Sequence, residues 1–189
     1  MVLPPLRFET LIENYHDEIY GYIWRLLDSA TNADSAVEAQ DLTQEVFLRA
    51  YKAFERLRPD SNYRAWLYKI ATHCAYTALK RGQRRTQYSA PLEDEQEDLA
   101  DTNPLPDQQA AQHETLAVIR RIIAALPAKQ QAAVMLRHVQ GLDYAEIAKA
   151  LDCSEDSARA NVYQAVRRLR REVAKAQDAE EGVQNDGWR

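Results

Sequence analysis

The sequence has few glycines and no long apolar run, and each absence excludes a class of protein. Its five glycines in 189 residues fall well below the usual ~7%. They lie too far apart to form a G-x-G-x-x-G or G-x-x-x-x-G-K-[ST] loop, which excludes the nucleotide-cradling folds. The longest apolar runs, such as residues 122–126, are far shorter than the ~20 residues of a membrane helix. We therefore expect no membrane insertion, no signal peptide and a cytoplasmic location.

Cysteine and histidine are also scarce, which limits redox and metal chemistry. The two cysteines, Cys74 and Cys153, form no C-x-x-C pair, and small buried residues are favoured over a redox switch. The four histidines show no metal-ligand spacing such as H-E-x-x-H. The sequence therefore predicts no metal, no cofactor and no catalytic residue.

Basic residues are missing from one segment, and this divides the chain into parts. Residues 86–119 carry eight acidic and no basic side chains, whereas residues 1–85 have a net charge of +1 and residues 120–176 of +5. The acidic segment also contains prolines, which oppose a packed helix. The expected organisation is a domain at residues 1–85, a flexible acidic linker at 86–111, a second domain at 112–176 and a disordered acidic tail at 177–189. The linker is either a solvated spacer or a strand that occupies a basic channel on a partner, and composition leaves both interpretations open.

Helix-forming residues dominate the composition, while Val, Ile and Thr are sparse, so we predict an all-α protein with two small helical domains. In the first domain, apolar residues spaced by three and four predict helices over residues 8–27, 41–57 and 63–83. The second of these helices has a further stripe away from its core face, made of Asp41, Gln44, Glu45, Leu48 and Lys52. A solvated face with a favourable Glu-to-Lys pattern would explain it, although Leu48 among polar neighbours favours a partner-binding face.

The third predicted helix carries a basic face with an aromatic residue and a histidine in it. The face contains Lys69, His73, Tyr76, Lys80 and Arg81. Cations can contact phosphates and rings can stack on unpaired bases, so this face suits a nucleic-acid strand. A basic face that is simply solvated is the alternative.

The second domain shows the layout of a helix-turn-helix. Pro127 opens a helix that ends before Gly141, a short helix follows over residues 144–151, and Ser154 is a good N-cap for a longer helix. On the last helix, the residues that point outward are Arg159, Ala160, Tyr163, Gln164 and Arg167. An exposed face of this kind fits the DNA major groove, although helical hairpins without DNA-binding roles are common.

Two motif blocks resemble one known family in the right order. Asp41-Leu-Thr-Gln-Glu-Val-Phe-Leu-Arg-Ala-Tyr-Lys-Ala-Phe and Tyr63-Arg-Ala-Trp-Leu-Tyr-Lys-Ile-Ala resemble region 2 of the extracytoplasmic-function (ECF) sigma factors. The segment from Leu126-Pro to Arg168-Arg-Leu-Arg looks like region 4 of the same family. The resemblance covers roughly residues 8–85 and 112–173. It implies a non-enzymatic sigma factor that binds core RNA polymerase and directs promoter-specific initiation.

The resemblance also implies a role for each surface. The second helix would dock on the β′ clamp helices of core polymerase through Asp41, Leu42, Gln44, Glu45, Leu48 and Lys52, and the second domain would meet the β flap. The −10 promoter element would be read by Ser61, Asn62, Lys69, His73, Tyr76, Lys80 and Arg81. The −35 element would be read by Arg159, Ala160, Tyr163, Gln164 and Arg167. The acidic linker would thread the polymerase cleft, and an anti-sigma factor would sequester the free protein.

Four residues depart from the pattern common in the family. Other residue types are frequent at the positions of His73, Thr77, Asn161 and Gln164, which leaves the bases read at both elements open.

Three other functions are alternatives to this interpretation. A stand-alone helix-turn-helix regulator would leave the first domain without a role. Asp41 and Glu45 could hold a metal in a helical bundle, but the E-x-x-H pairs of such enzymes are missing. A pure protein-interaction adaptor is the third alternative.

Overall fold

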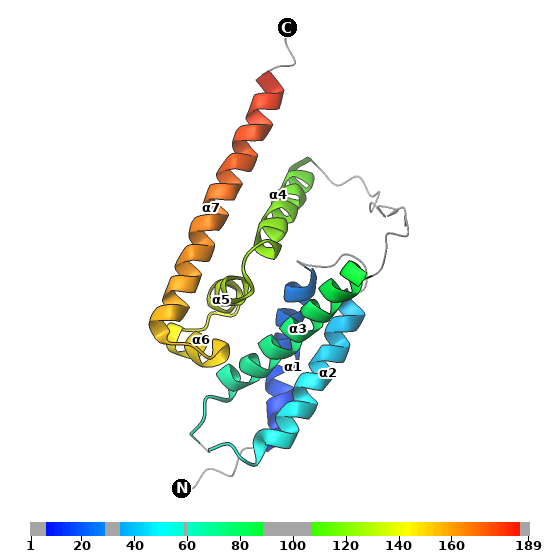
Figure 1. Ribbon diagram of the computed structural model, residues 1–189, viewed down its shortest axis with the longest axis vertical. Coiled ribbons are helices and arrows are strands. Elements are labelled where there is room, and N and C mark those ends of the chain that lie inside the picture. Colours follow the sequence, from blue (N-terminus) through cyan, green and yellow to red (C-terminus); the bar gives the residue numbers. More distant parts are fainter. Residues whose placement is uncertain (1–6, 29–34, 59, 89–106, 186–189) are drawn as a thin grey trace.

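The computed structural model describes residues 7–28, 35–58, 60–88 and 107–185, and every regular element within these ranges is a helix. The helices are α1 (Phe8–Asp28), α2 (Ser35–Phe54), α3 (Tyr63–Tyr88), α4 (Asp107–Ala124), α5 (Ala128–His138), α6 (Tyr144–Leu151) and α7 (Glu155–Asn185) (Figure 1). The all-α prediction is confirmed. We call α1–α3 the N-terminal module and α4–α7 the C-terminal module. Residues 89–106, most of the predicted linker, lie outside the described residues.

The N-terminal module is a bundle in which α1, α2 and α3 each pack against the other two. Its centre holds Tyr22 and Tyr68, both fully buried, with their rings edge to face and 5.0 Å apart. The Tyr22 hydroxyl shares a 2.9 Å hydrogen bond with Oγ1 of Thr72, so neither buried polar group lacks a partner. Burial raises the pKa of Tyr22 and keeps the phenol neutral.

Two details of this module differ from the sequence prediction. Helix α2 begins at Ser35, before the predicted start at residue 41, and ends at Phe54 rather than residue 57. Helix α3 ends at Tyr88 rather than residue 83; it buries Tyr68 and Ala71 fully, and Trp66 only partly. The reason is that α3 is packed on more than one side, by α1, α2 and α6. Its buried arc is therefore wider than a single stripe.

The C-terminal module confirms the predicted turns of the helix-turn-helix. Gly141 ends the α5 segment at φ +70, in the left-handed region that favours glycine. The side chain of Asp143 accepts from the backbone N–H of Glu146, whose carboxylate accepts from the Asp143 N–H, and this capping box starts α6. Asp152 ends α6 at φ 52, and Oγ of Ser154 accepts from the backbone N–H of Ser157 at the start of α7.

The ends of this module differ from expectation. Helix α4 begins at Asp107, inside the segment expected to be linker, and this helix was not predicted from the sequence. Helix α7 continues through Asn185, which corrects the expectation of a disordered tail for residues 177–185. A helix can extend beyond the region where it packs, because its backbone hydrogen bonds are internal and each added residue contributes one bond.

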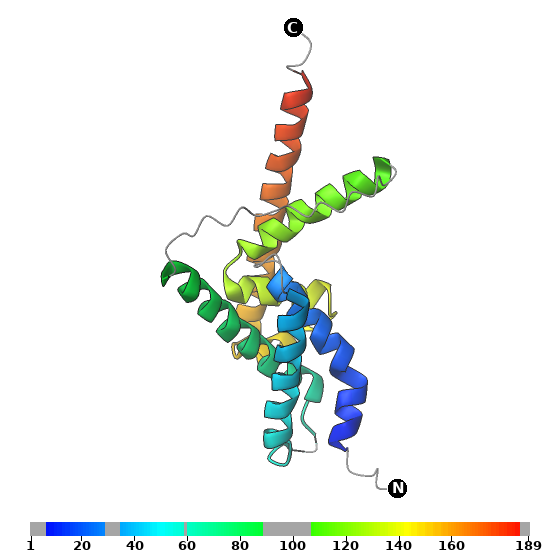
Figure 2. The same cartoon turned by 90° about the vertical axis from the view of Figure 1, so that its right-hand side faces the viewer.

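The two modules pack against each other through α3 and α6, with a smaller contact between α1 and α5. A single apolar cluster runs through both modules, from Leu26 and Leu67 to Leu136 and Ile147. Figure 1 shows α1–α3 to the right of α5 and α6, and Figure 2 shows the upper parts of α4 and α7 diverging from each other. Within the described residues, no helix is long and apolar enough to span a bilayer.

We expect the Tyr22–Thr72 hydrogen bond to be worth a measurable part of the stability of the N-terminal module. Tyr22→Phe should lower the free energy of unfolding by about 1–2 kcal/mol, because it leaves the Thr72 hydroxyl without that partner. Thr72→Val should cost a similar amount. Chemical denaturation of the double variant should show less loss than the two single losses added together. Strictly additive losses would mean that the two side chains are not coupled.

Candidate functional site

Helix α2 presents the predicted docking face to solvent. Leu48 is 61% exposed, and two further large apolar side chains of this helix, Val37 and Tyr51, are each 64% exposed. Glu45 forms a 2.5 Å ion pair with Arg49 one turn along the helix. Asp41, Gln44 and Lys52 are also exposed, whereas Leu42 is partly buried and packs against the core. The structure thus places all the predicted docking residues except Leu42 on an open surface that combines apolar and charged groups.

The predicted −10 residues gather around the start and one face of α3, but the C-terminal module contacts three of them. The side-chain amide of Asn62 accepts from the Ala65 N–H, which caps α3, and donates to Oε1 of Glu146 at 2.9 Å. Nζ of Lys69 pairs with Oδ1 of Asp152 at 2.9 Å. The Tyr76 hydroxyl donates to the backbone carbonyl of Ala128.

The remaining residues of this set are divided between exposed and partly buried positions. His73, Lys80 and Arg81 are exposed, and Ser61 is partly buried. His73 lines a cleft of about 570 Å³ between the modules. The lining comprises Arg49, Ala53, Trp66, Lys69, Ile70, Thr72, His73, Tyr76, Lys129, Ala150, Leu151 and Asp152. Burial in this region raises the pKa of Tyr76. The α3 face is therefore a wall of the intermodule cleft.

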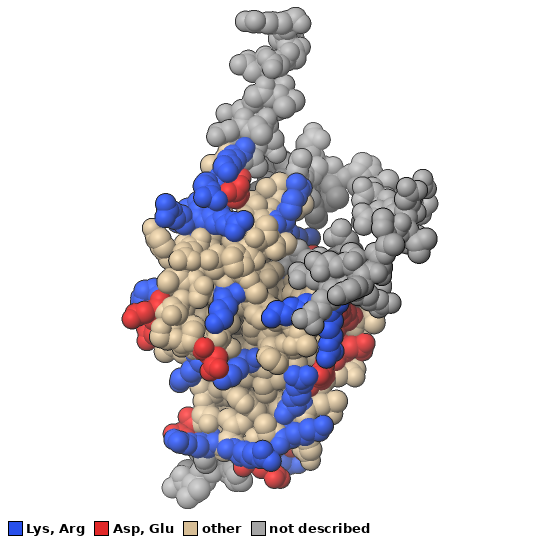
Figure 3. Space-filling view, viewed as in Figure 1, with Lys and Arg blue, Asp and Glu red and all other residues tan. Residues whose placement is uncertain are grey.

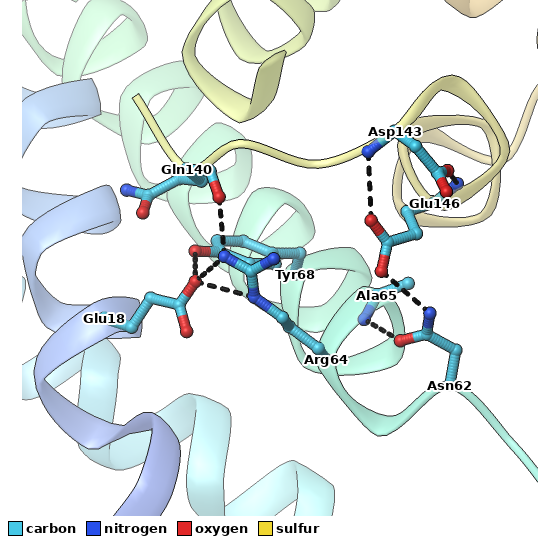
Figure 4. Close-up of polar contacts among 8 residues, drawn as sticks. All are labelled: Glu18, Asn62, Arg64, Ala65, Tyr68, Gln140, Asp143 and Glu146. Atoms are coloured by element: carbon cyan, nitrogen blue, oxygen red, sulfur yellow. Dashed lines mark hydrogen bonds and ion pairs between the residues drawn. The ribbon is translucent and has the colours of Figure 1, made fainter. Parts of the chain in front are cut away.

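A polar cluster beside this cleft was not predicted from the sequence (Figure 4). Arg64 on α3 donates to the Glu18 carboxylate on α1, with Nε at 2.8 Å from Oε1, and Nη2 donates to the backbone carbonyl of Gln140 at 2.6 Å. The Tyr68 hydroxyl donates to the same Glu18 oxygen at 2.7 Å. Because these residues are far apart in the sequence, no local pattern could have paired them. Only the Asp143–Glu146 capping box next to the cluster has a sequence signature.

The predicted −35 residues all lie on one open face of α7. Arg159, Ala160, Tyr163, Gln164 and Arg167 are all exposed, and Tyr163 is 66% exposed. In the view of Figure 3, Lys and Arg side chains outnumber Asp and Glu, and a group of them lies near the described end of α7. The face predicted from the helical period is thus present in the tertiary structure.

The aromatic ring of Tyr144 contacts Arg159, the first residue of this α7 face. The guanidinium of Arg159 lies 4.4 Å from the ring centroid of Tyr144, and that of Arg137 lies 4.7 Å from the same centroid. Cation–π attraction of this kind favours a fixed guanidinium position. Arg159 also pairs with Glu155 at 3.0 Å. Tyr144 therefore positions a predicted DNA-contacting residue, and this role was not predicted from the sequence.

The four residues that depart from the family pattern differ in how their side chains are used. Thr77 donates to the carbonyl of His73 at 2.8 Å, and Asn161 donates to the carbonyl of Ser157 at 2.9 Å. The amide oxygen of Gln164 accepts from Gln130 at 2.8 Å. Three of the four thus have internal hydrogen bonds, whereas His73 remains exposed in the cleft.

The described residues include both cysteines and bear on the expectation about metal binding. Cys74 is buried, but Cys153 is only partly so, which corrects half of the expectation. Burial raises the pKa of both thiols, which opposes formation of the reactive thiolate. In the part of the chain that the structure describes, no group of three or more His, Cys, Asp or Glu residues could hold a metal ion.

Comparison with known proteins places these two modules in a family. Residues 11–85 match Sigma-70 region 2, and residues 116–169 match Sigma-70, region 4. The chain is 31% identical over 163 residues to the RNA polymerase sigma-H factor of Pseudomonas aeruginosa, with 84% of this chain and 81% of that protein covered. The chain is an ECF sigma factor. It is also 27% identical over 167 residues to the ECF RNA polymerase sigma factor SigX of Bacillus subtilis, covering 88% of this chain and 83% of that one.

Solved structures show the same fold. The sigma factor RpoE of Bartonella quintana, in complex with the anti-sigma factor NepR, matches with a TM-score of 0.63 and 20% identity, covering 88% of this chain and 96% of that chain. CnrH, in complex with the cytosolic domain of CnrY, matches with a TM-score of 0.59 and 18% identity, covering 91% of this chain and 88% of that chain. In this sigma factor, α1–α3 carry region 2, and the segment from α4 to the middle of α7 carries region 4. As a sigma factor, the protein directs transcription initiation.

Proposed function

We propose that this sigma factor binds core RNA polymerase through α2 and contacts promoter DNA through two separate surfaces, on α3 and α7. The observation that carries the proposal is the helix-turn-helix of α6 and α7, which leaves Arg159, Tyr163 and Arg167 exposed on one face of its second helix. The second helix of such a unit fits the major groove of DNA. The same chain carries a region 2 module, which a stand-alone regulator would not need.

The α2 face is the polymerase-docking surface in this proposal. Leu48 supplies an apolar anchor that folding leaves 61% exposed, and Asp41, Gln44 and Lys52 surround it with polar groups. An apolar centre with a polar rim is typical of protein interfaces. The partner expected for this face is the pair of clamp helices of the β′ subunit, while the C-terminal module would contact the β flap.

The α3 face is the −10 surface, and the α7 face is the −35 surface. On α3, Lys69, Lys80 and Arg81 supply cations for phosphates, and His73 and Tyr76 supply rings for unpaired bases. On α7, Arg159 and Gln164 can reach base edges, while Arg167 is placed to contact the phosphate backbone. When one of these two surfaces binds its promoter element, the other is held near its own element at a high effective concentration, so two weak DNA contacts give tighter binding together.

Control of this sigma factor is proposed to follow its structural relatives, of which RpoE was solved with the anti-sigma factor NepR and CnrH with the cytosolic domain of CnrY. An anti-sigma factor would hold the free chain and block its access to polymerase. The protein would act where polymerase works, in the cytoplasm, and would catalyse no reaction of its own. Most of the proposed acidic connector, at residues 86–111, falls outside the described residues, so its course through polymerase is an expectation from the sequence alone.

Reconstituted transcription tests the function directly. Core RNA polymerase supplemented with this protein should start transcripts at discrete positions on fragmented genomic DNA of the source bacterium, mapped by sequencing of RNA 5′ ends. Core enzyme alone is the control. A protein that binds operator DNA tightly without polymerase, and gives no transcripts with it, would be a stand-alone regulator, and the proposal would be wrong.

Leu48→Asp should weaken binding to core polymerase by about 2–4 kcal/mol, because it places a charge at the apolar centre of the interface. The free energy of unfolding should change little, since Leu48 is exposed in the free protein. Surface plasmon resonance on immobilised core enzyme measures the first quantity, and thermal denaturation the second. Val37→Asp on the same helix is the matched control, because Val37 is equally exposed but lies outside the predicted docking set. Equal losses from both variants would argue against a docking centre at Leu48.

Arg159→Ala should cost the holoenzyme about 1–3 kcal/mol of −35 discrimination if the guanidinium reads a base. Tyr144→Leu should reduce the same discrimination, because it removes the ring against which Arg159 stacks, whereas Tyr144→Phe should retain it. In the Arg159→Ala background, Tyr144→Leu should have no further effect. Initiation rates on promoters with systematically changed −35 bases give these values. An equal loss on every −35 sequence would instead identify Arg159 as a phosphate contact.

A further inference from the structure

The cleft between the two modules has a lining that the proposed function uses only in part. Its volume of about 570 Å³ falls within the range of roughly 300–1,000 Å³ that is typical of sites for small ligands. Helix α2 contributes Arg49 and Ala53, α3 contributes the longest wall, and the C-terminal module contributes Lys129 from α5 and the end of α6. Because residues of both modules line it, the cleft is a product of the tertiary fold rather than of either module.

The wall formed by α3 combines aromatic rings with a cation along one face of the helix. Its residues follow one another at steps of three, four and three, and they are Trp66, Lys69, His73 and Tyr76. Side chains at these steps are neighbours on a helix surface. Trp66 and Tyr76 are both partly buried, and the Tyr76 hydroxyl donates to the carbonyl of Ala128, next to the start of α5. The wall therefore offers flat apolar surface on which a planar ring can pack.

The cations of the cleft differ in whether a carboxylate already neutralises them. Arg49 pairs with Glu45 on its own helix at 2.5 Å, and Lys69 pairs with Asp152 at 2.9 Å. Lys129 is exposed and forms no ion pair with any residue that the structure describes. Hydrogen bonding to Lys69 lowers the pKa of Asp152, and the charge of Lys129 lowers it further. Lys129 thus adds positive potential to this part of the cleft without a counter-ion among the described residues.

We propose that this cleft is a binding site for a nucleoside monophosphate. The base packs against the rings of Trp66 and Tyr76, and the phosphate pairs with the ammonium group of Lys129. The apolar residues at the end of α6 supply further surface for the base. One phosphate matches the single cation that lacks a counter-ion, whereas a longer phosphate chain brings negative charge towards the carboxylate of Asp152.

A base of the −10 strand presents the same chemistry, because every nucleotide of DNA also joins a ring to a phosphate. The position of the cleft favours the free nucleotide. Lys129 and the end of α6 belong to the C-terminal module, so a continuous strand has to pass through the junction to reach them, whereas a mononucleotide needs only the enclosed volume. The site does not rest on the proposed function, since binding requires neither polymerase nor promoter DNA.

Isothermal titration calorimetry of the full-length protein with AMP, GMP, CMP and UMP tests the site. At least one of these nucleotides should bind and should raise the melting temperature in a concentration-dependent way. The corresponding nucleoside and ribose 5-phosphate should each bind about tenfold more weakly or worse, because each lacks one half of the contacts. Absence of binding by all four nucleotides would overturn the proposal. Equally tight binding of ribose 5-phosphate would also overturn it, because the cleft would then be a simple anion contact.

Substitution of Lys129 tests the phosphate contact. Lys129→Ala should weaken nucleotide binding about tenfold, because it removes the partner of the phosphate, whereas Lys129→Arg should retain most of the affinity. Lys149→Ala is the matched control, since Lys149 is an exposed cation of α6 that does not line the cleft. Equal losses from the two alanine variants would mean that general charge attraction holds the nucleotide, and the assigned site would be wrong.

Filling the cleft tests the position of the base. Ala53 lines the cleft from α2 and is only partly buried, so Ala53→Phe should place a ring in the enclosed volume and abolish nucleotide binding. Thermal denaturation without nucleotide checks that each variant is folded. A folded Ala53→Phe variant that binds the nucleotide as tightly as the unaltered protein would show that the base lies elsewhere.

A short single-stranded oligonucleotide separates the two sources of this chemistry. For a mononucleotide site, Lys129→Ala weakens binding of the nucleotide and leaves the affinity for the oligonucleotide nearly unchanged, measured by fluorescence anisotropy. Parallel loss of both affinities would make the cleft a part of the DNA surface and overturn the proposal. Reconstituted transcription without added nucleoside monophosphate reports on the proposed function separately, so failure of the nucleotide site leaves that function standing.

Discussion

Helix α3 forms a wall shared by both halves of the molecule, and the rest of the structure depends on how it is packed. One side contacts α1 and α2, where Tyr68 and Leu67 are fully buried, and another contacts α6. This second contact combines apolar side chains, such as Trp66 and Leu151, with the exposed ion pair of Lys69 and Asp152. The first contact is therefore the core of one module, whereas the second joins the two modules through apolar and polar groups together.

This difference in packing connects the fold to its use. The proposed function needs one DNA-contacting surface on each module. The buried Tyr22–Thr72 pair and the apolar residues around it give the N-terminal module buried contacts of its own. The contact between the modules combines an apolar cluster that is continuous with both cores and an exposed ion pair between Lys69 and Asp152.

Much of the architecture could be predicted from the sequence, because its signals are local. The helical spacing of apolar residues predicted the bounds of α1 and α6 closely, and Gly141 and Ser154 marked helix ends through the backbone conformation and the capping bond that those residue types favour. The exposed faces on α2 and α7 followed from the same periodicity. Helix α4 was missed because its acidic and polar beginning resembles the linker before it, and the helical continuation of α7 was missed because it has no packing stripe.

By itself, the sequence determined most of the helices, their order, the family and the faces that these helices can present, since all of these depend on residues close together in the chain. Only the tertiary structure decided which faces stay free. Lys69 and Asp152 are paired, and Arg64 reaches both Glu18 and Gln140, across separations that no periodic pattern spans. Whether a basic helical face is open to DNA or covered by its own chain depends on long-range packing, and that is set by the sum of many weak contacts formed together.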